Sequence, residues 1–350
     1  MPSGLVLIII GYIASLYIAW NIGANDAANP TDTAVGSGAL SIRKALILFS
    51  VFTCIGALAQ GWMVMKTFDR GIVKDIDIVA AVSAVIATGL WITIATLKGM
   101  PISTSQSATG AVLGIGLAYV YMGRITINDV KWSVVYTILT SWVLTPFLTI
   151  MLAIALYFVI DKLMYWLEKI RGRDNSIEKI LKYLIIFSLA FSAYSFGAND
   201  IANATGVYLT ITSRYFGIPD DLTKIFLAIL GGLGVVLGGF TLGKRVLTTV
   251  AFKITRLDLK TGLAAELSNA LVVWLFTTIP YLLFGYGLPI STTHATVSSI
   301  IGVGIAKHKN LKNVNWRIVL LITLSWLLTL PVTITLSFTF RTIAYMLTGS

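Results

Sequence analysis

The chain has 350 residues, of which 57% are hydrophobic and 12% are charged. Soluble domains carry about 25% charged residues, so this chain lacks the polar surface that a water-soluble protein needs. Its formal net charge is +11, but the basic residues lie in short breaks between apolar runs and have no interleaved aromatics. This pattern follows the positive-inside rule and excludes a nucleic-acid-binding protein.

Apolar runs long enough to cross a bilayer, which takes about 20 residues per helix, follow one another along the chain. They lie at Leu5–Trp20, Ala45–Met65, Ile78–Leu97, Trp132–Ile160, Ile225–Leu242, Leu263–Phe284 and Ile318–Phe340. These runs do not alternate between apolar and polar residues, as the strands of a membrane barrel do. We therefore expect an all-α membrane protein with roughly 10–12 spans, because only helices and closed barrels satisfy their backbone groups in lipid.

A polar, basic stretch at 161–182 divides the chain into a first repeat, 1–160, and a second repeat, 183–350. A short basic linker is expected on the cytoplasmic side of the membrane. The N-terminal tip has no Lys or Arg and the tail has only Arg341, so both termini are expected outside. Each half then crosses the membrane an odd number of times, and the two repeats must be inverted relative to each other.

Three motifs of the first half return in the same order and at similar offsets in the second half. Gly23–Asn29 returns as Gly197–Asn203, Pro101–Ser105 as Pro289–Thr293, and Ser141–Thr145 as Ser325–Thr329. Internal duplication of this kind is typical of secondary transporters. The sequence therefore predicts a substrate site that both repeats help to form.

The first repeated motif places an aspartate between amide residues at the end of an apolar run. Charged groups at membrane depth are costly, so they face a cavity, a partner or an ion. A single copy could cap a helix, but two copies at the same spacing favour a cation site made of hard oxygen ligands. The candidate sodium ligands are Asn25, Asp26, Asn29, Asn199, Asp200 and Asn203.

The second repeated motif begins with proline, continues with hydroxyl residues and leads into a short glycine-rich apolar segment. Proline followed by Ser or Thr is typical of a helix start, and these segments look too short for full spans. We expect re-entrant helical hairpins whose free N–H groups form an anion site near mid-membrane. The candidate anion ligands are Ser103, Thr104, Ser105, Ser291, Thr292 and Thr293, followed by Gln106 and His294 at matching positions.

Glu266 is an acidic residue within an apolar run of the second half. It either takes part in ion coupling or has a structural partner. The matching position of the first half is Val82, so this glutamate has no acidic counterpart there.

The paired Gly-Ala-Asn-Asp-x-Ala-Asn and Pro-Ile-Ser-Thr motifs resemble those of the PiT inorganic phosphate transporter family. The resemblance covers essentially the whole chain and implies a sodium- or proton-coupled phosphate symporter with inverted repeats. It places phosphate between two re-entrant hairpins and cations at the Asn-Asp motifs. The chain departs from the family pattern at Gln106, where a histidine is usual, and at Pro30 and Val82.

These observations predict sodium-coupled symport of inorganic phosphate across the cytoplasmic membrane, with no cofactor. The partners are phosphate, Na⁺ and the bilayer, and self-association into a homo-oligomer is left open. Alternatives are a proton-coupled phosphate permease or a sulfate permease of the same fold. An intramembrane hydrolase with Ser291, His294 and Asp200 as a triad is disfavoured, because the hydroxyl and Asn-Asp motifs occur twice and the histidine once.

Overall fold

The computed structural model describes residues 2–171 and 175–348. Helices make up the architecture of these ranges, and no strand occurs within them. The elements are α1 (Pro2–Asp26), α2 (Asp32–Gly36), α3 (Ile42–Gln60), α4 (Trp62–Lys66), the π-helix η1 (Thr67–Gly71), α5 (Ile78–Leu97), α6 (Thr104–Tyr121), the 3-10 turn η2 (Ile127–Asp129), α7 (Trp132–Arg171), α8 (Asn175–Asp200), α9 (Ala202–Thr205), the 3-10 turn η3 (Gly206–Tyr208), α10 (Leu209–Phe216), α11 (Asp220–Thr241), α12 (Gly243–Lys253), α13 (Leu259–Phe284), α14 (Thr292–His308) and α15 (Trp316–Thr348).

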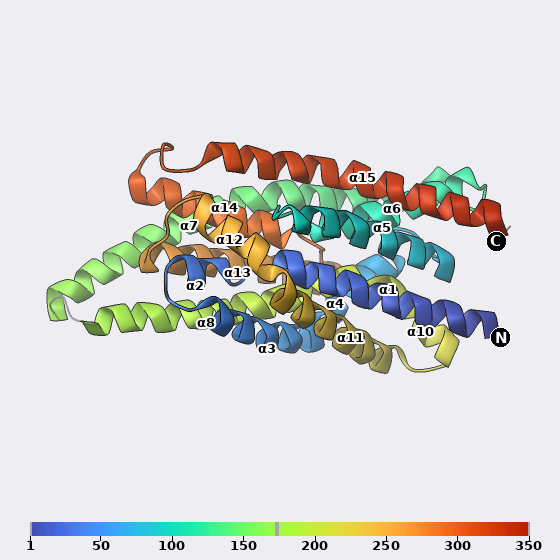
Figure 1. Cartoon of the computed structure of the whole chain (residues 1–350), viewed down its shortest axis with the longest axis horizontal. Coiled ribbons are helices and arrows are strands. Elements are labelled where there is room, and N and C mark those ends of the chain that lie inside the picture. Colours follow the sequence, from blue (N-terminus) through green and yellow to red (C-terminus); the bar gives the residue numbers. More distant parts are fainter. Residues whose placement is uncertain (1, 172–174, 349–350) are drawn as a thin grey trace.

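The polar stretch at 161–182 is helical on both sides of its centre. α7 continues to Arg171 and α8 begins at Asn175, while residues 172–174 of the predicted linker lie outside the described residues. α7 and α8 approach each other at one end of the molecule, and both chain termini lie at the opposite end (Figure 1).

Eight helical stretches of the described chain are long and apolar enough to cross a membrane. Many of their large apolar side chains face outward, for example Val143 and Leu327 at 73% and 68% exposure, as the lipid-facing surface of a multi-pass membrane protein requires. The expected number of roughly 10–12 spans was too high. The reason is that α6 and α14 begin inside the protein and are buried over most of their length, as the re-entrant prediction implies.

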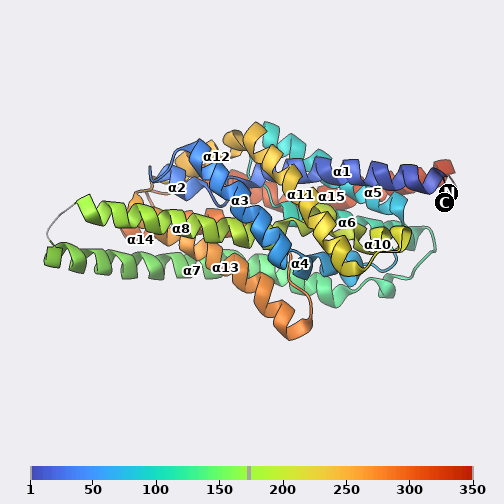
Figure 2. The same cartoon turned by 90° about the horizontal axis from the view of Figure 1, so that it is seen from below.

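The two halves interlock around the ends of α1 and α8. α1 runs inward from the end that holds the termini, whereas α8 runs inward from the opposite end (Figures 1 and 2). α1 packs on α11 of the second half, and α8 packs on α3 of the first. The first glycine of each Asn-Asp motif permits this contact, because a Cβ would lie 1.9 Å from the Val235 carbonyl oxygen at Gly23 and 2.0 Å from that of Thr53 at Gly197.

The two re-entrant helices also cross between the halves. α6 packs on α15, and α14 packs on α7. Gly110 and Gly114 of α6 allow close approach, because a Cβ at either would lie 2.2 Å or less from a hydroxyl oxygen of α15. Each re-entrant helix is therefore held by the last long helix of the other half.

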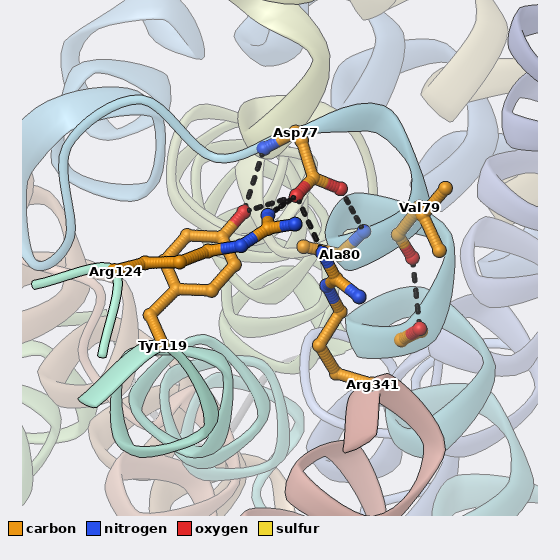
Figure 3. A network of polar contacts seen from close by, with 7 residues as sticks. Asp77, Val79, Ala80, Tyr119, Arg124 and Arg341 are labelled. Carbon is orange, nitrogen blue, oxygen red and sulfur yellow. Dashed lines mark hydrogen bonds and ion pairs between the residues drawn. The ribbon is translucent and has the colours of Figure 1, made fainter. Parts of the chain in front are cut away.

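An ion-pair network around Asp77 joins side chains of three separate helical segments (Figure 3). Asp77 caps α5 by accepting a hydrogen bond of 2.8 Å from the Ala80 N–H. The same carboxylate pairs with Arg124 at 2.8 Å and with the fully buried Arg341 at 2.9 Å, and it accepts from the Tyr119 hydroxyl at 2.8 Å. The network therefore ties α5, α6 and α15 together.

Candidate functional site

The two Asn-Asp motifs lie at the inner ends of α1 and α8, against the starts of α6 and α14. Asp26 and Asp200 are fully buried. Asp26 accepts hydrogen bonds from Thr104 of its own half at 2.6 Å and from Thr293 of the other half at 3.3 Å. The structure thus joins a predicted cation ligand, Asp26, to predicted anion ligands of both halves.

Asp200 holds the matching position in the second half. Its Oδ1 accepts from the Ser105 hydroxyl at 3.3 Å and from the Asn203 amide at 2.8 Å. Asn203 also donates to Ser105 at 3.1 Å. In the first half, Asn29 donates to the hydroxyls of Thr292 and Thr293, both at 3.1 Å. Each motif therefore reaches the hairpin start of the opposite half.

The buried oxygens of this site that have no hydrogen-bond partner within the described chain include Asn29 Oδ1, Asn203 Oδ1 and Asp200 Oδ2. Leaving a buried acceptor unpaired costs about 1–3 kcal/mol. Carboxylate and amide oxygens are the ligands that hard cations prefer. The oxygens of these three residues are therefore suited to a cation such as Na⁺.

The other two motif asparagines hold the loops before the re-entrant helices. Asn25 donates to Thr96 Oγ1 at 2.9 Å and to the Met100 carbonyl at 3.0 Å, and its Oδ1 accepts from the Ile102 N–H at 3.1 Å. Asn199 donates to Thr277 Oγ1 at 2.7 Å and to the Leu288 carbonyl at 2.8 Å. Both side chains thus position the hairpins, and their predicted part in cation binding stays a prediction.

The starts of α6 and α14 are built in the same way and braced against each other. Ser103 caps α6 by accepting from the Gln106 N–H at 3.2 Å, and Ser291 caps α14 through the His294 N–H at 3.1 Å. The Ser105 hydroxyl lies 2.5 Å from the Ile290 carbonyl and the Thr293 hydroxyl lies 2.9 Å from the Ile102 carbonyl. In each case the carbonyl competes with an aspartate for the single hydroxyl proton. Two helix N-termini with their dipoles and hydroxyls therefore lie side by side, as an oxyanion site requires.

Two tryptophans to which the sequence assigned no role form hydrogen bonds to the loops that precede α6 and α14. The Trp142 indole N–H donates to the Pro289 carbonyl at 3.1 Å, and that of Trp326 donates to the Pro101 carbonyl at 3.3 Å. Both belong to the third repeated motif, Ser141–Thr145 and Ser325–Thr329. The repetition of this motif was the signal that could have identified them.

Gln106 and His294 line a cavity of about 600 Å³ between α7 and α15. The aspartates and the hydroxyl residues of the hairpin starts are not among its lining residues. The His294 ring packs on Trp326 with the ring centroids 3.9 Å apart. The predicted contact of these two side chains with phosphate stays a prediction.

Glu266 has a partner that sequence reasoning missed. Thr33 of α2 donates to its carboxylate, and α2 carries a second fully buried acid, Asp32, within electrostatic range of Glu266. Both oxygens of Asp32 and Oε1 of Glu266 have no hydrogen-bond partner within the described chain. Although Val82 leaves the first half without a matching acid, α2 supplies one, and its position three residues after Asn29 was the available signal.

The triad of the hydrolase alternative is not assembled. Ser291 Oγ accepts from the backbone N–H of His294, and the His294 ring contacts the Trp142 carbonyl. Among the described residues, no hydrogen bond joins this ring to Ser291 or Asp200. The arrangement therefore lacks the nucleophile–base contact that such catalysis needs.

Comparisons with known proteins identify the family of the chain. Residues 22–337 match the phosphate transporter family. A protein of Pyrococcus furiosus assigned as a phosphate permease is 31% identical, with 94% of this chain and 93% of that protein aligned. One of Chlamydia pneumoniae, assigned likewise, is 30% identical, with 96% and 98% aligned. A solved sodium-dependent phosphate transporter has a TM-score of 0.80 and 28% identity over 97% of this chain and 99% of that one. The chain therefore belongs to the phosphate transporter family, a family of membrane transporters and not of enzymes.

Proposed function

We propose that this protein is a secondary active transporter that carries inorganic phosphate together with Na⁺ across the cytoplasmic membrane by alternating access. One observation carries the proposal: Asp26 and Asp200 each accept hydrogen bonds from hydroxyls at the hairpin start of the other half. The candidate cation ligands and the candidate anion ligands thus share their contacts. Binding of one ion must then change the surroundings of the other.

The anion part of the site offers neutral donors. The starts of α6 and α14 supply backbone N–H groups and helix dipoles, and Thr104, Ser105, Thr292 and Thr293 add hydroxyls. Such donors hold a tetrahedral oxyanion without the full charge of a lysine or arginine. This suits a transporter, because phosphate must also be released.

Charge balance explains the requirement for a cation. Phosphate at neutral pH carries one to two negative charges, and the site already holds Asp26 and Asp200 in a buried environment. Like charges at low dielectric repel by several kcal/mol, about 4 kcal/mol at 4 Å and an effective dielectric constant of 20. Na⁺ bound at the unpaired oxygens of Asn29, Asn203 and Asp200 offsets this repulsion. The sodium dependence named for the similar solved transporter supports the same choice of ion.

The topology follows from charge and from the position of the termini. The basic stretch at 161–182 is proposed to be cytoplasmic and both termini external, and they lie at opposite ends of the molecule (Figure 1). The repeats 1–160 and 183–350 are then inverted, since α1 and α8 enter the centre from opposite sides. The site lies where the two repeats meet.

A proton-coupled cycle is the second candidate, and the pair of Asp32 and Glu266 favours it. Two buried carboxylates within electrostatic range of each other can share a proton. Na⁺ remains the first choice, because Asp26 and Asp200 are surrounded by amide and hydroxyl groups that suit a metal ion.

Purified protein in liposomes tests both candidates. Labelled phosphate is supplied outside, and Na⁺ and pH gradients are imposed separately at equal membrane potential. Uptake should follow the Na⁺ gradient and should be absent in empty liposomes. Uptake that ignores both gradients would contradict secondary active transport.

A further inference from the structure

The cavity between α7 and α15 is lined by residues from both halves of the chain. Equivalent residues of the two halves line it in pairs: Trp142 with Trp326, Val143 with Leu327, and Gln106 with His294. Its walls are mostly apolar. The side chains of Val143 and Leu327 are also largely exposed on the lipid-facing surface. The cavity therefore opens toward the bilayer, and a lipid chain is the occupant that the surroundings supply.

The polar end of the cavity offers hydrogen-bond acceptors. Pro146 lacks an N–H group, so the Trp142 carbonyl one turn earlier in α7 loses its helical partner. His294 Nδ1 lies 3.4 Å from that carbonyl oxygen. A carbonyl oxygen can only accept, so Nδ1 carries the proton, and Nε2 of the neutral ring is left as an acceptor.

The two acceptors are buried and unpaired. His294 is 4% exposed and Gln106 is 8% exposed, and neither His294 Nε2 nor Gln106 Oε1 has a hydrogen-bond partner within the described chain. Both side chains line the cavity. An occupant that satisfies these two atoms must bring a donor, and the cavity lining contains no Lys or Arg that would balance an ionised head group.

We propose that this cavity binds a neutral lipid that carries a free hydroxyl group. Its chain lies between α7 and α15, and its hydroxyl donates to His294 Nε2 or Gln106 Oε1. The volume of about 600 Å³ is within the range of small-molecule sites. No covalent step is involved.

Occupancy should restrain the hairpin starts. Gln106 and His294 belong to the first turns of α6 and α14, and their backbone N–H groups are bonded to the capping residues Ser103 and Ser291. Trp142 and Trp326 line the cavity and also hold the loops before these helices. A bound lipid alcohol therefore bridges the elements that must separate if the hairpins move. Under the proposed transport function, it acts as an inhibitor.

The binding test uses quenching of tryptophan fluorescence in reconstituted protein and needs no transport activity. Dibrominated stearyl alcohol is compared with dibrominated methyl stearate, which has the same chain but no donor. The alcohol should quench saturably with at least about fivefold higher apparent affinity, as one net hydrogen bond allows. Trp326→Phe should remove much of the saturable quenching. The control variant Trp316→Phe changes a half-exposed tryptophan of the same helix, outside the cavity lining, and should keep it.

The double substitution His294→Phe and Gln106→Leu should reduce the ratio of the apparent affinities for the alcohol and the ester to about one, while the ester still quenches. Equal quenching by both probes in the unaltered protein would overturn the proposal, because it would show bulk lipid contact alone. Displacement of the alcohol by inorganic phosphate would also overturn it, since the cavity would then belong to the anion. Either result leaves sodium-coupled uptake in liposomes unaffected, so failure here is distinguishable from failure of the transport proposal.

Discussion

Asp26 of α1 and Thr293 of α14 are 267 residues apart in the chain and are joined by a hydrogen bond of 3.3 Å. The same hydroxyl oxygen accepts from Asn29 at 3.1 Å and lies 2.9 Å from the Ile102 carbonyl, to which it can donate. The Thr293 hydroxyl thus contacts the Asp26 carboxylate, the Asn29 amide and the Ile102 carbonyl, all of which belong to the first half. The hydroxyl has a single proton, for which Asp26 and the Ile102 carbonyl compete. A cation that draws Asp26 away would change this competition at the hairpin start, which is a direct physical route for coupling.

Asp26→Asn and Asp200→Asn should each abolish sodium-driven phosphate uptake while the protein still folds. Each change removes a buried charge but keeps an oxygen and nearly the same volume. Loss of one charge from a largely desolvated cation site costs several kcal/mol. The measurement is labelled phosphate uptake in liposomes at limiting Na⁺.

Asp221→Asn provides the control, because this aspartate lies on the surface with a side chain that is 90% exposed. It should leave uptake unchanged. Normal uptake in both Asp26→Asn and Asp200→Asn would remove these residues from the site.

The coupling ion should be Na⁺, and a pH gradient alone in Na⁺-free buffer should drive no uptake. Glu266→Gln and Asp32→Asn should raise the Na⁺ concentration needed for half-maximal uptake if the pair supports the Na⁺-bound state. Uptake driven by a pH gradient in the unaltered protein, and lost in both variants, would instead establish the proton-coupled candidate. Uptake rates under the four combinations of gradients decide between them.

The repeated motifs allowed the segments that meet at the centre of the protein to be predicted from the sequence. Two Asn-Asp copies and two Pro-Ile-Ser-Thr copies indicated paired helix ends and hairpin starts, and the structure brings these elements together. The all-α fold class could also be predicted from the sequence, because a backbone that crosses lipid must form either helices or a closed barrel. The number of spans did not follow, since length and hydropathy hardly distinguish a re-entrant helix from a full one.

The partners of the individual side chains could not be predicted. Asn25 and Asp26 are neighbours in the chain, yet Asn25 holds a loop while Asp26 contacts both hairpin starts. Which way each points depends on how α1 lies against its neighbours. The exchange of α6 and α14 between the halves depends on close packing at glycines, which no local pattern of one half contains. Arg341 was read as a tail charge and is in fact fully buried.

Asp77→Asn should destabilise the protein without weakening the helix cap, because asparagine caps helices about as well as aspartate. Burial opposes ionisation of Asp77, but the Ala80 N–H, Tyr119 and Arg341 outweigh it and hold the pKa of this carboxyl below its usual range. A lowered pKa in the folded state contributes stability that is present above the pKa of the unfolded chain and is lost as pH falls through the folded value. The melting temperatures of the two proteins should therefore differ at neutral pH and converge in acid below about pH 4.

Arg341→Met tests the other partner of this network. Breaking a fully buried pair costs about 3–5 kcal/mol, and since the Asp77 side chain is 34% exposed, we expect about 2 kcal/mol here. Thermal unfolding in detergent measures both variants, with Asp221→Asn as the surface control. Equal melting temperatures of Asp77→Asn and the unaltered protein at neutral pH would show that the ion pairs contribute nothing measurable.

The last prediction concerns the choice between phosphate and sulfate, which are tetrahedra of similar size. At neutral pH phosphate keeps at least one proton and sulfate keeps none, so a site with an acceptor favours phosphate. Asp26 and Asp200 lie beside the hairpin hydroxyls, and Gln106 Oε1 has no hydrogen-bond partner within the described chain. Unlabelled phosphate should compete with labelled phosphate at least tenfold better than sulfate does, which corresponds to about 1.4 kcal/mol. Gln106→Ala should leave this ratio unchanged, because Gln106 lines the cavity between α7 and α15, whose lining includes neither aspartate. Competition uptake at several pH values measures the ratio, and equal competition by sulfate would reduce the proposal to transport of an oxyanion.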